Sequence, residues 1–297
     1  MITLEATRAR GRQALTSASL AKGALQACDT ALSRPGRLYS AFPIASRLFL
    51  GWSAALLPAV PTTWLPAAVA CEFVLAACDL VDRHTDGNFA TDREERSALQ
   101  KQGWELPAGI SLFLLAHELL SEVETSRART LTAMHTVGRI SRRALAAHHR
   151  DGVLRAYPAA RPEDALTVLR WRSGELFALP CVCAAILAGT SSRSVVLARR
   201  FGRALGCAGQ LEDDLADRRD DARSGRKTLP LLLPEVADDD GELADAATSV
   251  LVHRFLEDAA SALRQLPPLV YPSPCNCEAL WSFLPEELRC YARSLPV

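Results

Sequence analysis

Apolar residues recur at spacings of three and four along most of the chain, as they do on helices that bury one face. No stretch has the alternation of apolar and polar residues expected of a half-buried strand. Breakers rich in proline, glycine or serine separate the apolar segments. The pattern predicts helices at roughly 3–32, 40–57, 64–84, 105–122, 125–149, 162–189, 193–220, 242–265 and 276–293. We therefore expect one all-α domain over residues 1–297.

A long apolar stretch from Leu48 to Cys78 has Glu72 as its only charged residue. Three prolines, Pro58, Pro61 and Pro66, interrupt it, so neither part offers the run of about 20 apolar residues that a membrane-spanning helix needs. We therefore predict two core helices joined by a proline-rich turn, and no transmembrane segment.

Composition narrows the choice of partners and compartment. The 34 basic and 34 acidic residues balance, so the chain lacks the basic excess of a nucleic-acid-binding protein. Its nine cysteines include C-x-C pairs rather than the C-x-x-C of zinc and redox sites, which favours reduced thiols in a cytoplasmic protein. The N-terminal segment is rich in arginine, as organellar transit peptides are, but we expect it to begin the first helix.

Two groups of acidic residues follow apolar segments. Asp213, Asp214 and Asp217 lie within two helical turns, and Asp79, Asp82 and Asp86 share one helix face. Carboxylates at these spacings repel one another, so they need a cation unless they mark a solvated helix end. Mg²⁺ prefers carboxylate oxygens, and two such helices side by side would form a metal-lined mouth.

The segment "GQLEDDLADRRDDARSGRKTLPLL" resembles the second aspartate-rich motif of trans-polyprenyl diphosphate synthases. "LRWRSGELF" resembles the Lys-Thr segment of that family, with Arg172 at the lysine and Ser173 at the threonine. The residues that match the second motif are Gln210, Asp213, Asp214, Asp217, Gly225, Lys227, Thr228, Leu229 and Pro230. The resemblance implies the isoprenoid synthase fold, a helical bundle around a central apolar cavity.

The resemblance also implies an activity, in which Mg²⁺ binds the diphosphate of an allylic prenyl substrate and that diphosphate departs to leave a carbocation. It further implies a possible homodimer. It assigns metal binding to Asp79, Asp82, Asp86, Asp213, Asp214 and Asp217, with Asp82, Asp213 and Asp217 as the catalytic acids. It assigns binding of the substrate diphosphate to Arg172, Lys227 and Gln210.

The first acidic motif departs from the family pattern D-D-x-x-D. In one register the sequence reads "CDLVD", which places Cys78 at the first aspartate, and a thiol is a poor ligand for Mg²⁺. In a shifted register Asp82 and Asp86 have the four-residue spacing of the first and last acids. Both registers stay open at the level of sequence.

The chain also has fewer of the basic residues that are expected to bind a second diphosphate. Elongating synthases carry Gly-Lys-Arg-x-Arg-Pro before the first motif and Arg-Arg-Gly after it, whereas this chain has "RPGRLYSAFP" and "GNFATDREERS". Arg37, Arg93 and Arg96 are the candidate remnants of these basic sites. The sequence therefore favours a terpene cyclase, with a chain-elongating synthase or another prenyltransferase as the alternative. The further alternative is an inactive regulatory subunit, which Cys78 would favour.

Overall fold

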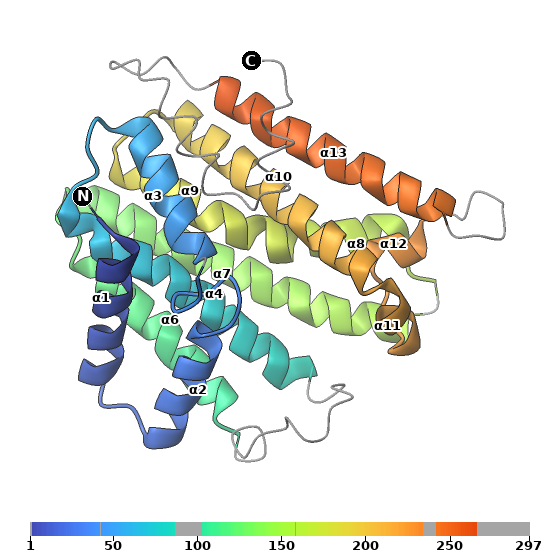
Figure 1. Ribbon diagram of the computed structural model, residues 1–297, viewed down its shortest axis with the longest axis horizontal. Helices are drawn as coiled ribbons and strands as arrows, with labels where there is room; N and C mark the ends of the chain where they lie inside the picture. The colour runs from blue at the N-terminus through green and yellow to red at the C-terminus, as the bar shows by residue number, and fades with distance from the viewer. Residues whose placement is uncertain (1, 42, 87–102, 158, 234–241, 266–297) are drawn as a thin grey trace.

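The computed structural model describes residues 2–41, 43–86, 103–157, 159–233 and 242–265, and these residues form helices and connecting turns without a strand (Figure 1). The α-helices are α1 (Leu4–Ser17), α2 (Lys22–Leu32), α3 (Ile44–Leu56), α4 (Leu65–Asp86), α6 (Glu105–Ser121), α7 (Arg127–Ala156), α8 (Pro162–Leu169), α9 (Glu175–Leu187), α10 (Ser192–Ala216), α11 (Arg218–Arg223), α12 (Leu229–Leu232) and α13 (Glu242–Arg264). A 3₁₀ turn, η1 (Thr62–Trp64), precedes α4, and a π-helical turn, η2 (Arg170–Gly174), joins α8 to α9.

The all-α prediction is confirmed, with local corrections. The predicted helix at 3–32 is two helices, because Ser19 has a left-handed φ of 50° that no glycine or proline announces. The predicted helix at 125–149 continues to Ala156, because Gly152 is tolerated inside it. The predicted helix at 276–293 lies outside the described residues, so the extension of one domain to residue 297 stays a prediction.

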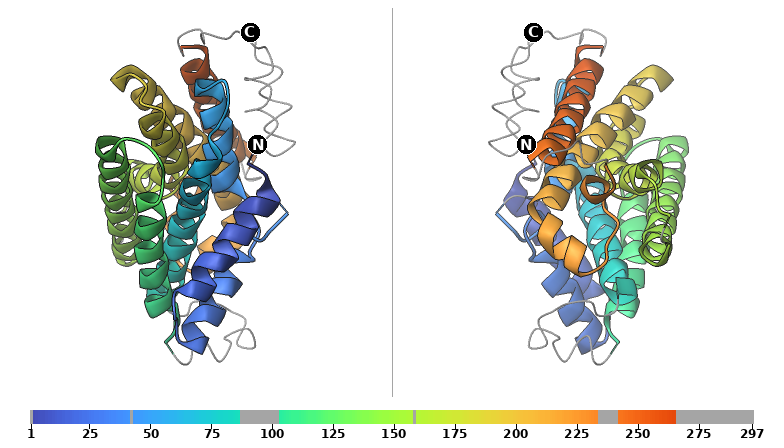
Figure 2. Two further views of the ribbon diagram at one scale, coloured as in Figure 1. Left: turned by 90° about the vertical axis from the view of Figure 1, so that its left-hand side faces the viewer. Right: turned by 90° about the vertical axis from the view of Figure 1, so that its right-hand side faces the viewer.

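The helices lie side by side around a shared apolar core, with α4 near its centre (Figures 1 and 2). In Figure 1 the C-terminal ends of α4, α7 and α10 all point to the lower right, so residues near these ends come together. The stretch Thr62–Thr85 is long and apolar enough to cross a membrane by composition, but 83% of its most apolar window is buried in the bundle. It is a core helix here, as predicted, although Pro66 lies in the first turn of α4 and does not shorten the apolar run.

Glu72 is an acid with no exposed surface in the middle of α4. Its Oε1 accepts a hydrogen bond from the backbone N–H of Ser46 at 2.7 Å, so the side chain caps α3, whose N-cap residue Pro43 makes no side-chain cap. Burial raises the pKa of Glu72 to about 7, although the hydrogen bond from Ser46 and the charge of Arg37 act in the opposite direction. A neutral Glu72 therefore fits its surroundings below that pH.

The same pKa predicts how the free energy of unfolding changes with pH. Between the ordinary pKa of a glutamate and about 7, folded Glu72 keeps a proton that the unfolded chain releases, so stability falls as the pH rises through this window. Glu72→Gln imitates the protonated form. It should unfold in urea like the parent protein at pH 5 and be more stable than the parent, on the order of 2–3 kcal/mol, at pH 8. Equal differences at both pH values would contradict this account.

Glu175 is a second fully buried acid, at the first turn of α9. Arg199 of α10 binds both of its carboxylate oxygens, at 2.6 and 3.2 Å. Arg203, also of α10, and Arg143 of α7 approach the same carboxylate at 3.3 and 3.4 Å. One buried charge thus joins three helices directly after the π turn.

Loss of the negative charge at position 175 would leave three guanidinium groups around a neutral side chain. Glu175→Gln should therefore lower the free energy of unfolding by about 3–5 kcal/mol, as breaking other buried ion pairs does. Urea denaturation followed by circular dichroism measures this change. Glu163→Gln, at an exposed position of α8, is the matched control, and a loss as small as the control's would show that the Glu175 cluster contributes little.

Candidate active site

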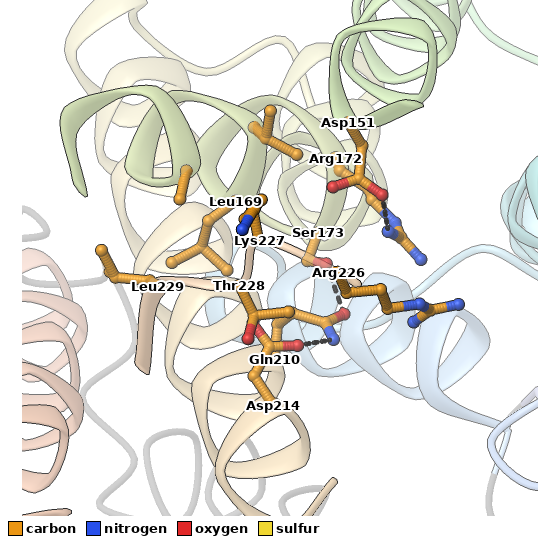
Figure 3. Close-up of a pocket in the computed structure, with 12 residues that line it drawn as sticks. Asp151, Leu169, Arg172, Ser173, Gln210, Asp214, Arg226, Lys227, Thr228 and Leu229 are labelled. Carbon is orange, nitrogen blue, oxygen red and sulfur yellow. Dashed lines mark hydrogen bonds and ion pairs between the residues drawn. The ribbon is translucent and has the colours of Figure 1, made fainter. Parts of the chain in front are cut away.

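A small polar pocket lies where the C-terminal parts of α7 and α10 meet η2 and the segment before α12 (Figure 3). Its volume is about 40 Å³, and one water needs roughly 10–15 Å³, so it has room for only a few water molecules. A diphosphate therefore requires side chains at its mouth to move. The lining residues are Asp151, Ala165, Val168, Leu169, Arg172, Ser173, Gln210, Asp214, Arg226, Lys227, Thr228 and Leu229.

Arg172, which the π turn carries, connects this pocket to the end of α4. Its Nη2 donates to Asp82 Oδ2 at 2.9 Å, and its Nη1 lies 3.8 Å from Asp151 Oδ2 on α7. The other oxygen of Asp82 lies 2.5 Å from Nδ1 of His148, a buried residue of α7. Burial opposes ionisation of Asp82, but His148 and Arg172, with Arg226, outweigh it and lower the pKa of this carboxyl.

Ser173, next to Arg172, begins a hydrogen-bonded chain into α10. Its hydroxyl donates to Gln210 Oε1 at 2.8 Å, and Gln210 Nε2 donates to Asp214 Oδ1 at 2.8 Å (Figure 3). Gly206 makes this contact possible, because a Cβ there would lie 2.5 Å from the carbonyl oxygen of Ser173. Burial raises the pKa of Asp214 to about 6, against the effect of its hydrogen bond from Gln210.

Asp213 and Asp217 differ from Asp79 and Asp82, which pair with Arg34 and Arg172, in lacking a protein cation. Both are exposed, and neither carboxylate forms an ion pair with any residue that the structure describes. Partial burial and the charge of Asp217 raise the pKa of Asp213. Two carboxylates that repel each other at the end of a helix fit a hard divalent cation such as Mg²⁺.

The described residues do not bring three or more potential ligands close enough to hold one metal ion. Of the predicted site residues, Arg172, Gln210, Asp214 and Lys227 line the pocket, and Asp82 contacts Arg172 without lining the pocket itself. Asp86 is the last residue of α4, and its side chain lies outside the described residues, as do Arg93 and Arg96.

Arg226 is a cation that the sequence analysis missed. Its Nη1 lies 3.6 Å from Asp221 Oδ1, its charge helps to lower the pKa of Asp82, and it lines the pocket beside Lys227. The signal was in the sequence: the family's G-K-x-T-L-P run, laid on Gly225 to Pro230, places Arg226 rather than Lys227 at the lysine.

The match to the polyprenyl synthetase family model spans residues 73–230, more than half of the chain, and includes both acidic groups and the π turn. The chain belongs to the polyprenyl synthetase family. A search of curated protein sequences finds no match.

Solved structures with this fold cover nearly the whole chain. Geranylgeranyl pyrophosphate synthetase from Pyrococcus horikoshii is 17% identical with a TM-score of 0.76, over 98% of this chain and 99% of that one. Polyprenyl synthase from Caulobacter crescentus, complexed with calcium and isoprenyl diphosphate, is 24% identical with a TM-score of 0.72, over 99% and 96%. Geranyltranstransferase from Thermotoga maritima is 18% identical with a TM-score of 0.69, over 98% and 97%. At these identities the likeness shows the isoprenoid synthase fold.

The contacts of α4 in this polyprenyl synthetase bear on the register of the first acidic motif, which the sequence left undecided. Asp79 pairs with Arg34 at 2.6 Å, away from the pocket residues, whereas Asp82 contacts Arg172. Cys78 is buried, and burial raises the pKa of its thiol to about 12, so it stays protonated. Asp82 belongs to both registers, so these contacts bear only on Cys78 and Asp79, the two residues that the shifted register leaves out.

The sequence analysis also missed His148 and Asp151. The predicted helix ended at residue 149, but α7 continues through Gly152 to Ala156, and His148 is buried against Asp82. His148, Asp151 and Arg155 lie at i, i+3 and i+7, so their shared face was present in the sequence. The early end assigned to the helix concealed it.

The two registers differ in the effect that they predict for Asp79→Asn, whereas Asp82 belongs to both registers. In the shifted register, Asp82→Asn should slow diphosphate release from an allylic prenyl diphosphate roughly 100-fold or more, because a charge near the reacting group is lost. Asp79→Asn should change the rate less than about tenfold, since Asp79 pairs with Arg34. Circular dichroism would check that both variants stay helical. A loss of rate in Asp79→Asn as large as that in Asp82→Asn would restore the other register.

Proposed function

We propose that this chain is a Mg²⁺-dependent prenyltransferase that ionises an allylic prenyl diphosphate and adds isopentenyl diphosphate to the resulting cation. The observation that carries this proposal is the position of Arg172, which contacts the first-motif acid Asp82 and also lines the pocket of the second motif. A cation between two sets of acids suits a polyanionic substrate that arrives with its own metal ions.

The comparisons support elongation more than the cyclisation that the sequence analysis favoured. The similar solved structures are described as geranylgeranyl pyrophosphate synthetase, polyprenyl synthase and geranyltranstransferase, and none of these three descriptions names a cyclase. Elongation is therefore the main proposal, and cyclisation becomes the second candidate.

The chemistry follows from the charges of the site. Asp213 and Asp217, with Asp82 and Asp86, would hold Mg²⁺, which when bound stabilises the departing diphosphate as a Lewis acid. Arg172, Arg226 and Lys227 would donate charge-assisted hydrogen bonds to the same diphosphate. Gln210 fixes Asp214 by its hydrogen bond and receives one from Ser173, which keeps this wall of the pocket in place.

Cyclisation retains one specific observation in its favour. Arg34 is occupied by Asp79, and the charge of Arg37 acts on buried Glu72, so two basic residues near the expected second diphosphate site are directed at acids of α4. An enzyme without that second site would ionise one substrate and rearrange it. The inactive-subunit alternative loses support, because the shifted register does not need an acid at Cys78.

Cytoplasmic location and a possible homodimer also belong to this proposal. The six cysteines within the described ranges are unpaired and buried, which fits a reducing compartment.

A labelling assay separates the two candidates. Purified protein is incubated with geranyl, farnesyl or geranylgeranyl diphosphate, labelled isopentenyl diphosphate and Mg²⁺. We expect label in a longer linear diphosphate, loss of that product with excess EDTA, and loss of roughly 100-fold or more of the rate in Asp213→Asn. Asp220→Asn is the control, because Asp220 is exposed and its ion-pair partner among the described residues is Arg223, at 3.1 Å. Release of a hydrocarbon without incorporation of label would favour the cyclase instead.

A further inference from the structure

The two oxygens of Asp82 are both occupied by protein groups. Arg172 donates to one at 2.9 Å, and Nδ1 of His148 lies 2.5 Å from the other. The side chains are largely enclosed, with exposed fractions of 18% for Asp82, 23% for Arg172 and 6% for His148. A metal ion that takes Asp82 as a ligand must therefore displace at least one of these contacts.

The second motif lacks this internal competition. Asp213 and Asp217 are exposed, and within the described part of the chain they have no ion-pair partner. A divalent cation can approach them without breaking a salt bridge. The two motifs, which look equivalent as acidic groups in the sequence, thus differ in how readily they accept a metal ion.

Arg172 can bind a second anionic partner in the pocket when its salt bridge to Asp82 breaks. It already lines the pocket together with Lys227 and Gln210, where a diphosphate would offer several oxygens to its planar guanidinium group (Figure 3). Exchange of a carboxylate for a diphosphate keeps Arg172 in charge-assisted hydrogen bonds, so the exchange preserves the number of strong contacts.

We propose that the Arg172–Asp82 salt bridge stands in for a metal ion in the ligand-free protein, and that a diphosphate opens the first motif to metal by drawing Arg172 away. This inference rests on the proposed function, because it takes Asp82 as a metal ligand. Ligand-free protein then binds divalent cation at the second motif alone. Since linkage is reciprocal, diphosphate and first-motif metal strengthen each other's binding by the same factor.

Titration of the ligand-free full chain with Mn²⁺, followed by electron paramagnetic resonance of the free ion, tests this directly. Wild-type protein should bind Mn²⁺ through Asp213, so Asp213→Asn should abolish most binding and Asp82→Asn should leave it unchanged. Arg172→Gln should gain a further class of site, or bind Mn²⁺ about tenfold more tightly, because the internal cation is gone. A site that depends on Asp82 in wild-type protein would overturn the proposal.

A double variant tests whether the gain in Mn²⁺ binding comes merely from the loss of one positive charge. The gain in Arg172→Gln should disappear in Arg172→Gln with Asp82→Asn, whereas a general charge effect would persist there. Arg150→Gln is the matched control on α7, since Arg150 pairs with Asp164 at 2.9 Å and should gain no site. If Arg172→Gln does not fold, the comparison of Asp82→Asn with Asp213→Asn still decides the matter.

This outcome is separable from the proposed function. If wild-type protein incorporates labelled isopentenyl diphosphate but Arg172→Gln shows no gain of Mn²⁺ binding, only the salt-bridge inference fails. If no incorporation occurs while the gain of Mn²⁺ binding is found, the exchange stands and the elongating activity falls.

Discussion

The site depends on one buried carboxylate, Glu175, and the arginines that neutralise it. A charge without water around it must be paired, so the first turn of α9 can only lie where Arg143 of α7 and Arg199 and Arg203 of α10 reach it. The π turn immediately before Glu175 carries Arg172 and Ser173. The cluster therefore determines where the pocket's main cation and the start of its hydrogen-bonded chain lie. It contacts no pocket acid itself, and it acts through the position of the π turn.

A contrast in electrostatics separates the two acidic groups that this turn faces. Asp82 is compensated by Arg172 and His148, whereas Asp213 and Asp217 repel each other without a described protein cation. A negatively charged substrate can draw Arg172 away from Asp82, because Arg172 can then bind phosphate oxygens instead of the carboxylate. In this account the fold supplies a site that is complete only when metal and diphosphate are both present, which protects an ionising enzyme from binding metal at the first motif without substrate.

The family pattern and the local contacts together explain the departures of this chain. Cys78 looks like a lost ligand in one register, but it is a buried, protonated thiol one turn before the acid that contacts Arg172. Glu72, deeper in α4, caps α3 and so holds together the core from which Asp82 projects. The departure at Cys78 thus falls at a packed position, while Arg172, Arg226 and Lys227 line a pocket that would suit a diphosphate.

The sequence by itself determined the all-α class and most of the helices, since their spacing of apolar residues is local. It also pointed to the acid group at Asp213 to Asp217 with Gln210, which follows a contiguous family pattern, and to Arg172 in a second, separate segment. It left open the register of the first motif, because Asp79, Asp82 and Asp86 share one helix face at either register. Only the tertiary structure decided the partners of Asp79 and Asp82, because Arg34 and His148 are distant in sequence and reach α4 through packing. The π turn, like the partners of Glu175, is decided by contacts between helices, and such contacts leave no periodic trace along the chain.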